Sequence, residues 1–234
     1  MSAEAVDRSP SAILFDLDGT LTDSRPGIVN SALFALRRFN ETRGADLPIP
    51  EPDSLAFMLG PPIQDSFAKL GGPAHASALV ALYRERYDPV GMLENSVYPG
   101  VEAMLEELAA LNYRLIVATS KNKIYARRIL DHFGLSRFFA AVHGAEPDGT
   151  RANKGALIAY VLNSHAIEPP LAAMIGDREH DALGAKAAGV WAIGALWGYG
   201  SREELAAAGA SPLLNSPSEI IATVTNGRPA QLAG

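Results

Sequence analysis

The chain has 234 residues, of which 48% are hydrophobic and 20% charged, and its formal net charge is −6 at pH 7. It contains no cysteine, which excludes disulfides, thiolate metal ligands and cysteine nucleophiles. The acidic balance and the scattered basic residues argue against binding to a nucleic-acid polymer. The N-terminus is polar, and no apolar run approaches the roughly 18 residues of a membrane span. We therefore expect a soluble, cytoplasmic protein without a membrane partner.

The first part of the chain predicts one strand followed only by helices. Residues 12–15 are apolar and predict a buried strand. Behind them, apolar residues recur at spacings of three and four up to Phe39, which indicates an amphipathic helix. Residues 40–52 are rich in Gly, Pro and Asp and predict a loop. Further helical patterns follow, at 55–59, 63–70 and 74–87.

After Tyr98-Pro99-Gly100 the pattern changes to strands that alternate with helices. We expect strands at 114–119, 138–142, 171–175 and 190–193, and helices at 101–111, 124–133, 156–162 and 181–188. Such alternation is typical of a parallel sheet covered on both faces.

The predicted fold class is therefore α/β, a Rossmann-like open parallel sheet with helices on both faces and an inserted α-helical domain. Residues 1–23 and 92–234 form the predicted core domain. Residues 24–91 form the predicted smaller domain, here called the helical insertion, and the stretch 22–24 is the expected hinge into it.

Polar side chains stand at four places where a predicted strand ends or in the loop that follows. We call them the motif residues: Asp16 with Asp18, Thr119 with Ser120, Lys154, and Asp177 with Asp181. Each group taken alone has a simpler explanation, as a turn, a helix cap or a solvated lysine. In open parallel sheets, however, the carboxyl edge is where ligands bind, so we expect these residues to converge.

Several carboxylates at one sheet edge would repel one another, and a divalent cation removes that difficulty. Oxygen ligands, without cysteine and without histidines at ligand spacing, favour Mg²⁺ over Zn²⁺. A carboxylate nucleophile, Mg²⁺, a hydroxyl and a lysine together predict a site for phosphoryl transfer. Rival phosphate motifs are incomplete: residues 184–189 lack the Lys-Ser/Thr of a P-loop, and Gly198-Tyr199-Gly200 lacks the third glycine of a dinucleotide fingerprint.

The motif residues also resemble a known family. DLDGT at 16–20, TS at 119–120, Lys154 and GDREHD at 176–181 are similar, in order and spacing, to the four motifs of the haloacid dehalogenase superfamily. The resemblance spans nearly the whole chain. The helical insertion resembles the small α-helical (C1-type) cap of that superfamily, which is found in phosphoglycolate phosphatases and β-phosphoglucomutases.

The resemblance implies a role for each motif residue. Asp16 would attack phosphorus and form an aspartyl-phosphate, and Asp18 would protonate the leaving oxygen and then activate water. Thr119 would bind phosphate, and Lys154 would neutralise the charge that Asp16 shares with the phosphoryl oxygens. The remaining implied roles are phosphate binding by the backbone around Leu17, Asp18, Gly19 and Ser120, Mg²⁺ ligation by Asp16, the carbonyl of Asp18 and Asp177, and orientation of the site by Asp181.

Finer similarities concern the substrate. Dehalogenases lack an acid at the position of Asp18, so its presence implies phosphate chemistry. LGPPIQDSF at 59–67, YRERY at 83–87 and GYGSREEL at 198–205 resemble a subgroup of 5′-nucleotidases and phosphoglycolate phosphatases. Arg178 stands where the best-known phosphoglycolate phosphatases have threonine, which favours the nucleotidases.

We therefore expect a Mg²⁺-dependent phosphomonoester hydrolase (phosphatase) that acts on a small phosphorylated metabolite. A nucleoside 5′-monophosphate is the first candidate substrate and 2-phosphoglycolate the second. Two further classes of protein share features with this sequence, a phosphomutase of the β-phosphoglucomutase type and a non-enzymatic scaffold, and the sequence leaves the oligomeric state open. The residues expected to set specificity lie in the helical insertion: Gly60, Pro61, Pro62, Lys69 and Arg84.

Overall fold

The computed structural model describes residues 9–146 and 149–229 and is built on a parallel sheet of six strands in the order β5-β4-β1-β6-β7-β8. The strands are β1 (Ala12–Phe15), β4 (Arg114–Asn122), β5 (Ala141–Ala145), β6 (Ala172–Gly176), β7 (Trp191–Ala195) and β8 (Leu213–Leu214). All four residues of β1 are apolar and fully buried, and β1 pairs in parallel with both β4 and β6. The predicted α/β fold class is confirmed.

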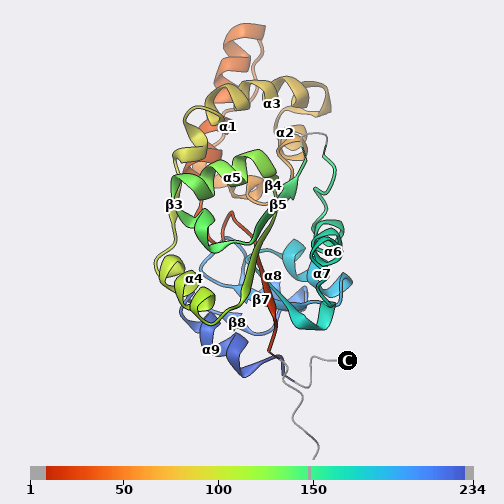
Figure 1. The fold of residues 1–234 in the computed structure, drawn as a ribbon. Helices are drawn as coiled ribbons and strands as arrows, with labels where there is room; N and C mark the ends of the chain where they lie inside the picture. Colours follow the sequence, from red (N-terminus) through yellow and green to blue (C-terminus); the bar gives the residue numbers. More distant parts are fainter. Residues whose placement is uncertain (1–8, 147–148, 230–234) are drawn as a thin grey trace, which may run out of the picture.

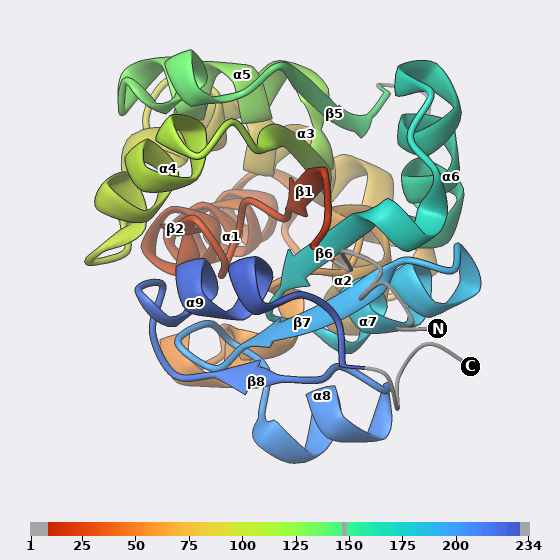
Figure 2. The ribbon, with the colours of Figure 1, turned by 60° about the horizontal axis from the view of Figure 1, so that its bottom comes forward.

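Helices cover both faces of this sheet. In chain order they are α4 (Val101–Ala110), α5 (Lys123–His132), α6 (Lys154–His165), α7 (Glu179–Ala187), α8 (Arg202–Ala207) and α9 (Glu219–Asn226). Successive side chains of a strand point to opposite faces. Ile13 and Phe15 accordingly belong to the core under α4, α5 and α9, whereas Leu14 belongs to the core under α6 and α7. Figure 2 shows the two sets of helices on opposite sides of the strands.

The helical insertion leaves and rejoins the sheet through two short strands, β2 (Thr22–Asp23) and β3 (Ser96–Val97). These strands pair antiparallel, so the two chain segments run side by side and form a two-stranded linker. Between them lie α1 (Arg25–Arg43), the 3₁₀ helix η1 (Pro52–Met58), α2 (Ile63–Gly71), α3 (Pro73–Tyr87) and the short η2 (Gly91–Leu93). Figure 1 shows α1, α2 and α3 gathered at one end of the molecule. The division into two domains at residues 24 and 91 stays a prediction.

Some element boundaries differ from the predictions for local reasons. Helix α1 continues to Arg43, into the segment predicted to be a loop at 40–52. Strand β5 begins at Ala141 instead of Phe138, because residues Leu135–Phe138 form the 3₁₀ helix η3. Strand β8 has only two residues, too few to show a periodic pattern in the sequence. No helix within the described residues is long and apolar enough to cross a bilayer.

A pair of histidines lies beside the β5 edge of the sheet. His143 Nε2 is 2.8 Å from His165 Nε2, and His165 Nδ1 is 2.8 Å from Arg114 Nη2. The His143 ring also packs edge-on against Tyr160, with the ring centroids 5.5 Å apart. Burial, and then the neighbouring His165 and nearby basic residues, lower the pKa of His143 to about 4. The folded protein therefore holds this ring in its neutral form over a wide pH range.

This lowered pKa predicts a loss of stability in weak acid. In the unfolded chain His143 takes up a proton near pH 6.5, whereas the folded protein takes it up only near pH 4. Between these values the unfolded state binds more protons, so the free energy of unfolding falls as the pH is lowered through this window. We expect the melting temperature of the wild type to fall more steeply from pH 7 to pH 5 than that of His143→Phe, with His132→Asn behaving as the wild type. Equal slopes in wild type and His143→Phe would contradict the prediction.

Candidate active site

The structure brings most motif residues together at the carboxyl ends of three adjacent strands. Asp16 follows β1, Thr119 lies near the end of β4, and Asp177 follows β6. Lys154 reaches them from the first turn of α6, and Asp181 from the first turn of α7. These five side chains are all buried, none belonging to a residue more than 9% exposed. Since β1 lies between β4 and β6, Asp16 stands at the centre of the group.

Lys154 holds two of the acids at once. Its Nζ lies 3.1 Å from Asp16 Oδ1 and 2.8 Å from Asp181 Oδ1, and it donates a hydrogen bond to Ala118 O at 3.0 Å. Burial disfavours the charged amine, but the carboxylates of Asp16 and Asp181 outweigh it and raise the pKa of Lys154 above its usual range. The lysine is therefore a permanent cation within the site.

Three carboxylates form the acidic cluster of the site. Asp16, Asp177 and Asp181 each offer an oxygen atom, and these atoms lie within 4.8 Å of one another. Burial first, and then the charges of Asp181 and Asp16, raise the pKa of Asp177 well above its ordinary value. Lys154 contacts only two of the three acids, so negative charge remains that a cation would balance. Clustered carboxylate oxygens are the donors that Mg²⁺ prefers, and the cluster fits this ion.

The membership of this cluster adds Asp181 as a candidate to the predicted Mg²⁺ ligands. Asp181 was expected only to orient the site, yet its carboxylate lies as close to Asp16 and Asp177 as a ligand would. Its Oδ2 also accepts a hydrogen bond from Arg178 N at 3.1 Å, which caps the start of α7. The predicted ligand role of the Asp18 carbonyl stays a prediction.

Two backbone amides that were predicted to bind phosphate make internal hydrogen bonds. Leu17 N donates to Asp16 Oδ1 at 2.8 Å, and Gly19 N donates to Thr22 O at 2.8 Å. Gly19 has φ +83°, and a Cβ at this position would lie 2.1 Å from Asp177 Oδ2. Only glycine therefore lets the loop after β1 turn in the left-handed region and lie against that carboxylate.

Asp18 faces a different partner, which sequence reasoning missed. Its Oδ2 accepts a hydrogen bond from Lys121 Nζ at 2.5 Å, and the side chains are only 15% and 8% exposed. The pairing of β4 with β5 shifts register after Thr119, and such irregularities redirect side chains near active sites. Lys121 N also donates to Thr119 Oγ1 at 3.2 Å. The only signal in the sequence was the position of Lys121 directly after Thr119-Ser120.

A pocket of about 460 Å³ opens beside Asp18, between the core and the helical insertion. From the core it is lined by Asp18, Ser120, Lys121 and Tyr125, among others. The helical insertion contributes mainly apolar and aromatic residues, with one arginine and one glutamine: Ile28, Met58, Gly60, Pro61, Pro62, Ile63, Gln64, Tyr83, Arg84 and Tyr87. A second hollow of about 460 Å³ reaches Lys154 and Ser120 from the side of α6 and α7. Gly60 and Pro62 line both spaces, so the loop that carries them divides one cleft.

Four of the five predicted specificity residues thus line the pocket beside Asp18. Lys69 is the exception, because its Nζ lies 5.9 Å from the centre of the Phe57 ring, where it packs on η1. Its predicted role in specificity has no support from this position. The sequence pattern could not distinguish the two sides of α2.

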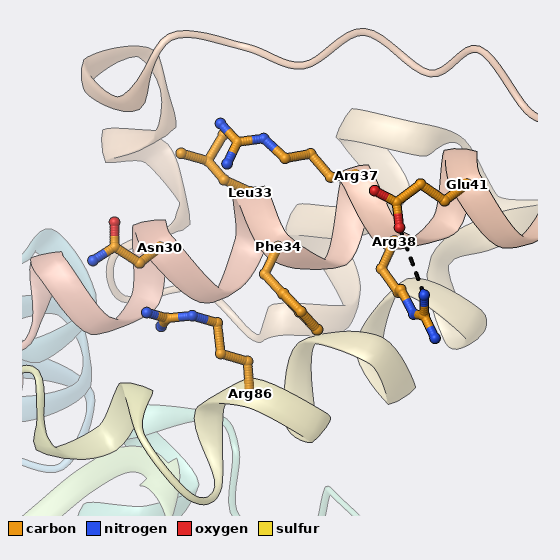
Figure 3. Close-up of a pocket in the computed structure, with 7 residues that line it drawn as sticks. All are labelled: Asn30, Leu33, Phe34, Arg37, Arg38, Glu41 and Arg86. Atoms are coloured by element: carbon orange, nitrogen blue, oxygen red, sulfur yellow. Dashed lines mark ion pairs between the residues drawn. The ribbon is translucent and has the colours of Figure 1, made fainter.

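A third hollow, of about 430 Å³, lies against α1 and is separate from the motif residues (Figure 3). Its lining contains three arginines, but Arg38 pairs with Glu41 at 3.6 Å and Arg86 pairs with Glu94 at 2.7 Å. Because much of this charge is neutralised locally and no motif residue lines it, the cleft beside Asp18 and Lys154 is the candidate active site.

Arg178 connects the acidic cluster with the helical insertion. Its Nε donates to Glu204 Oε1 at 2.7 Å, and its Nη1 donates to Leu59 O, just before Gly60 in the loop that divides the cleft. Its backbone amide donates the hydrogen bond that the Asp181 carboxylate accepts at the start of α7. In the sequence, Arg178 was notable only because it stands where the best-known phosphoglycolate phosphatases have threonine.

Residues 13–195 match the sequence profile of the family described as haloacid dehalogenase-like hydrolases. The chain belongs to this family. It is 45% identical to a 5′-nucleotidase from Pseudomonas aeruginosa over 199 aligned residues. The alignment covers 83% of this chain and 86% of that protein. It is 34% identical over 213 residues to a phosphoglycolate phosphatase from Rhodospirillum rubrum, covering 86% and 85% of the two chains.

One relative is named as a kinase and not as a phosphatase. The tyrosine-protein kinase PtkA of Mycobacterium tuberculosis is 39% identical over 198 residues, which are 85% of this chain but 66% of that protein. Among solved structures, a predicted phosphatase from Clostridium acetobutylicum superposes with a TM-score of 0.86 at 37% identity, over 93% of this chain and 99% of that one. The resemblance to the haloacid dehalogenase superfamily is therefore confirmed.

The buried acidic cluster predicts that a divalent cation stabilises the fold. An ion that binds only the folded state adds about 2.7 kcal/mol to the free energy of unfolding when present at roughly 100 times its Kd. We expect Mg²⁺ to raise the melting temperature of the wild type by several degrees, and to raise that of Asp177→Asn much less. Asp53→Asn serves as control, since Asp53 lies at the surface in the helical insertion and pairs with Arg25. An equal Mg²⁺ shift in wild type and Asp177→Asn would show that the ion binds elsewhere.

Proposed function

We propose that the chain is a Mg²⁺-dependent phosphomonoester hydrolase that works through an aspartyl-phosphate on Asp16 and prefers nucleoside 5′-monophosphates. The observation that carries this proposal is the separation of two acids on one short loop. Asp16 lies in the acidic cluster against Lys154, whereas Asp18 lines the pocket that would hold the leaving group. The first position suits a nucleophile beside a cation. The second suits an acid–base group, because Lys121 holds Asp18 Oδ2 while Asp18 Oδ1 has no partner among the described residues and can carry the proton.

The contacts of Asp16 support its role as the nucleophile. Leu17 N and Lys154 Nζ both contact Oδ1, so the carboxylate is held in one orientation and its other oxygen is the one to attack phosphorus. The new P–O bond forms as the bond to the leaving oxygen breaks, and Asp18 gives that oxygen its proton. Asp18 then takes a proton from the water that hydrolyses the aspartyl-phosphate. Mg²⁺, held by Asp16 and Asp177, would neutralise charge on the phosphoryl oxygens.

Thr119 and Lys154 are the proposed phosphate-binding side chains. Thr119 is 1% exposed and lies near the end of the strand next to β1, and Lys154 already bridges Asp16 and Asp181. The predicted contribution of Ser120 is supported by its place in the lining of both hollows of the cleft. These groups would hold the phosphoryl group at the junction of the two spaces, with the leaving group in the pocket beside Asp18.

The lining of that pocket favours a leaving group larger than glycolate. Tyr83 and Tyr87 stack with ring centroids 4.9 Å apart and planes 17° apart, and Tyr125 packs edge-on against Tyr87 at 5.5 Å. Aromatic and aliphatic walls suit a flat base and a sugar, whereas a two-carbon carboxylate needs mainly cationic partners. Lys121 and Arg84 could supply those partners, which keeps phosphoglycolate as the second candidate.

Phosphate release from a panel of substrates tests the proposal. The panel contains UMP, IMP, 2-phosphoglycolate and sugar phosphates, each with Mg²⁺ and with EDTA. We expect the highest kcat/KM for a nucleotide and no turnover with EDTA. A preference for phosphoglycolate would overturn the substrate assignment, and a product isomer without free phosphate would indicate a mutase.

The nucleophile assignment makes its own prediction. Asp16→Asn removes the attacking carboxylate but keeps the side-chain volume, so we expect turnover to fall at least about tenfold, with an unchanged circular dichroism spectrum. Asp53→Asn should retain wild-type turnover, since its side chain is exposed. A folded Asp16→Asn variant with more than about a tenth of wild-type turnover would exclude Asp16 as the nucleophile.

A further inference from the structure

The loop after β7 lies directly against the acidic cluster. A Cβ on Gly198 would stand 2.2 Å from Gly19 O, and a Cβ on Gly200 would stand 2.0 Å from Asp177 O. Both positions therefore require glycine, because the backbone of the loop touches the backbone of the site. The incomplete dinucleotide fingerprint noted in the sequence thus has a local explanation. We call residues 197–200 the Tyr199 loop.

The backbone of Tyr199 binds the acidic cluster. Tyr199 N donates a hydrogen bond to Asp177 Oδ2 at 2.8 Å, and Thr20 Oγ1 donates to Asp177 Oδ1 at 3.0 Å. Trp197 Nε1, at the start of the loop, donates to Thr20 O at 2.9 Å. The carboxylate of Asp177 is therefore held between the loop after β1 and the Tyr199 loop.

The side chain of Tyr199 reaches the linker of the helical insertion. Its hydroxyl donates to Asp23 Oδ1 at 2.9 Å and accepts a hydrogen bond from Arg25 N at 3.1 Å, and it lies 3.5 Å from Ser24 Oγ. Asp23 ends linker strand β2, and Arg25 begins α1. Both the donor and the acceptor capacity of the hydroxyl are used at the point where the chain leaves the core.

We propose that Tyr199 is a positioning residue that couples the acidic cluster to the orientation of the helical insertion. Its amide holds Asp177, and its hydroxyl holds the first linker strand and the start of α1. The insertion supplies about half of the residues that line the pocket beside Asp18, so the linker sets how that pocket closes on a leaving group. A cation that orders Asp177 also orders the linker, and by reciprocity a fixed linker favours the ordered cluster.

Hydrogen exchange of the full chain with and without Mg²⁺ tests this coupling without reference to catalysis. In the wild type we expect Mg²⁺ to slow exchange of the linker amides at 22–28. Tyr199→Phe keeps the amide on Asp177 and loses the hydroxyl, so it should show no added protection of the linker, and by reciprocity its Mg²⁺ affinity by calorimetry should fall by about the factor by which Mg²⁺ slows linker exchange in the wild type. Asp23→Ala, which removes the acceptor of the Tyr199 hydroxyl, should reproduce this loss, and Tyr113→Phe, remote from the site, should not. Mg²⁺ protection of the linker in Tyr199→Phe equal to that in wild type would overturn the proposal.

Kinetics provides a second readout, which depends on the proposed phosphatase activity. With UMP as substrate, Tyr199→Phe should raise KM about fivefold while kcat falls less than about twofold, since the pocket is loosened and the reacting groups are kept. A purely structural defect would instead lower kcat with the fraction of folded enzyme and leave KM unchanged, which would overturn the positioning role. If no substrate releases phosphate, the proposed function fails, while the exchange experiment still decides the role of Tyr199.

Discussion

The structure depends on one electrostatic constraint, the burial of three carboxylates at one edge of a sheet with a single lysine between them. Charged groups are costly to bury unless fixed partners surround them. Each acid accordingly has fixed partners. Asp16 and Asp181 share Lys154, and Asp177 accepts hydrogen bonds from a threonine hydroxyl and a backbone amide. Several unusual local features follow from this requirement, including the glycines that let two loops touch Asp177. The remaining negative charge is what makes the cluster suitable for a cation.

Much of the fold, and the position of the motif residues, follows from short-range patterns in the sequence. Strands β1 and β6 are continuous apolar runs, and β4 contains one at residues 115–118. A polar residue directly after such a run must lie at the carboxyl edge of a parallel sheet. The helices of the insertion show a period of three to four residues. These features depend only on neighbours along the chain, so they can be read without the structure.

The features that could not be predicted depend on contacts between distant segments. Lys121 meets Asp18 because β4 shifts its register against β5, and register is set by the partner strand. The Tyr199 hydroxyl meets Asp23 across 176 residues of sequence. Lys69 and Arg84 were equivalent in the sequence, yet only Arg84 lines the pocket, because the packing of α2 and α3 decides which side of each helix faces the cleft.

The contacts between the core and the helical insertion indicate which of them hold the pocket closed and which lie at the linker. Arg178 holds Leu59 O on one side of the cleft, and the Tyr125 hydroxyl donates to Asp88 Oδ1 on the other. Both contacts must break if the pocket is to open widely, whereas the bonds of Tyr199 lie at the linker, where a rotation moves atoms least. The carboxylates of the acidic cluster all belong to the core, so such a rotation would change access to the pocket and leave their geometry intact. An insertion attached in this way can vary its lining, and hence its substrate, without disturbing the buried charges on which the chemistry depends.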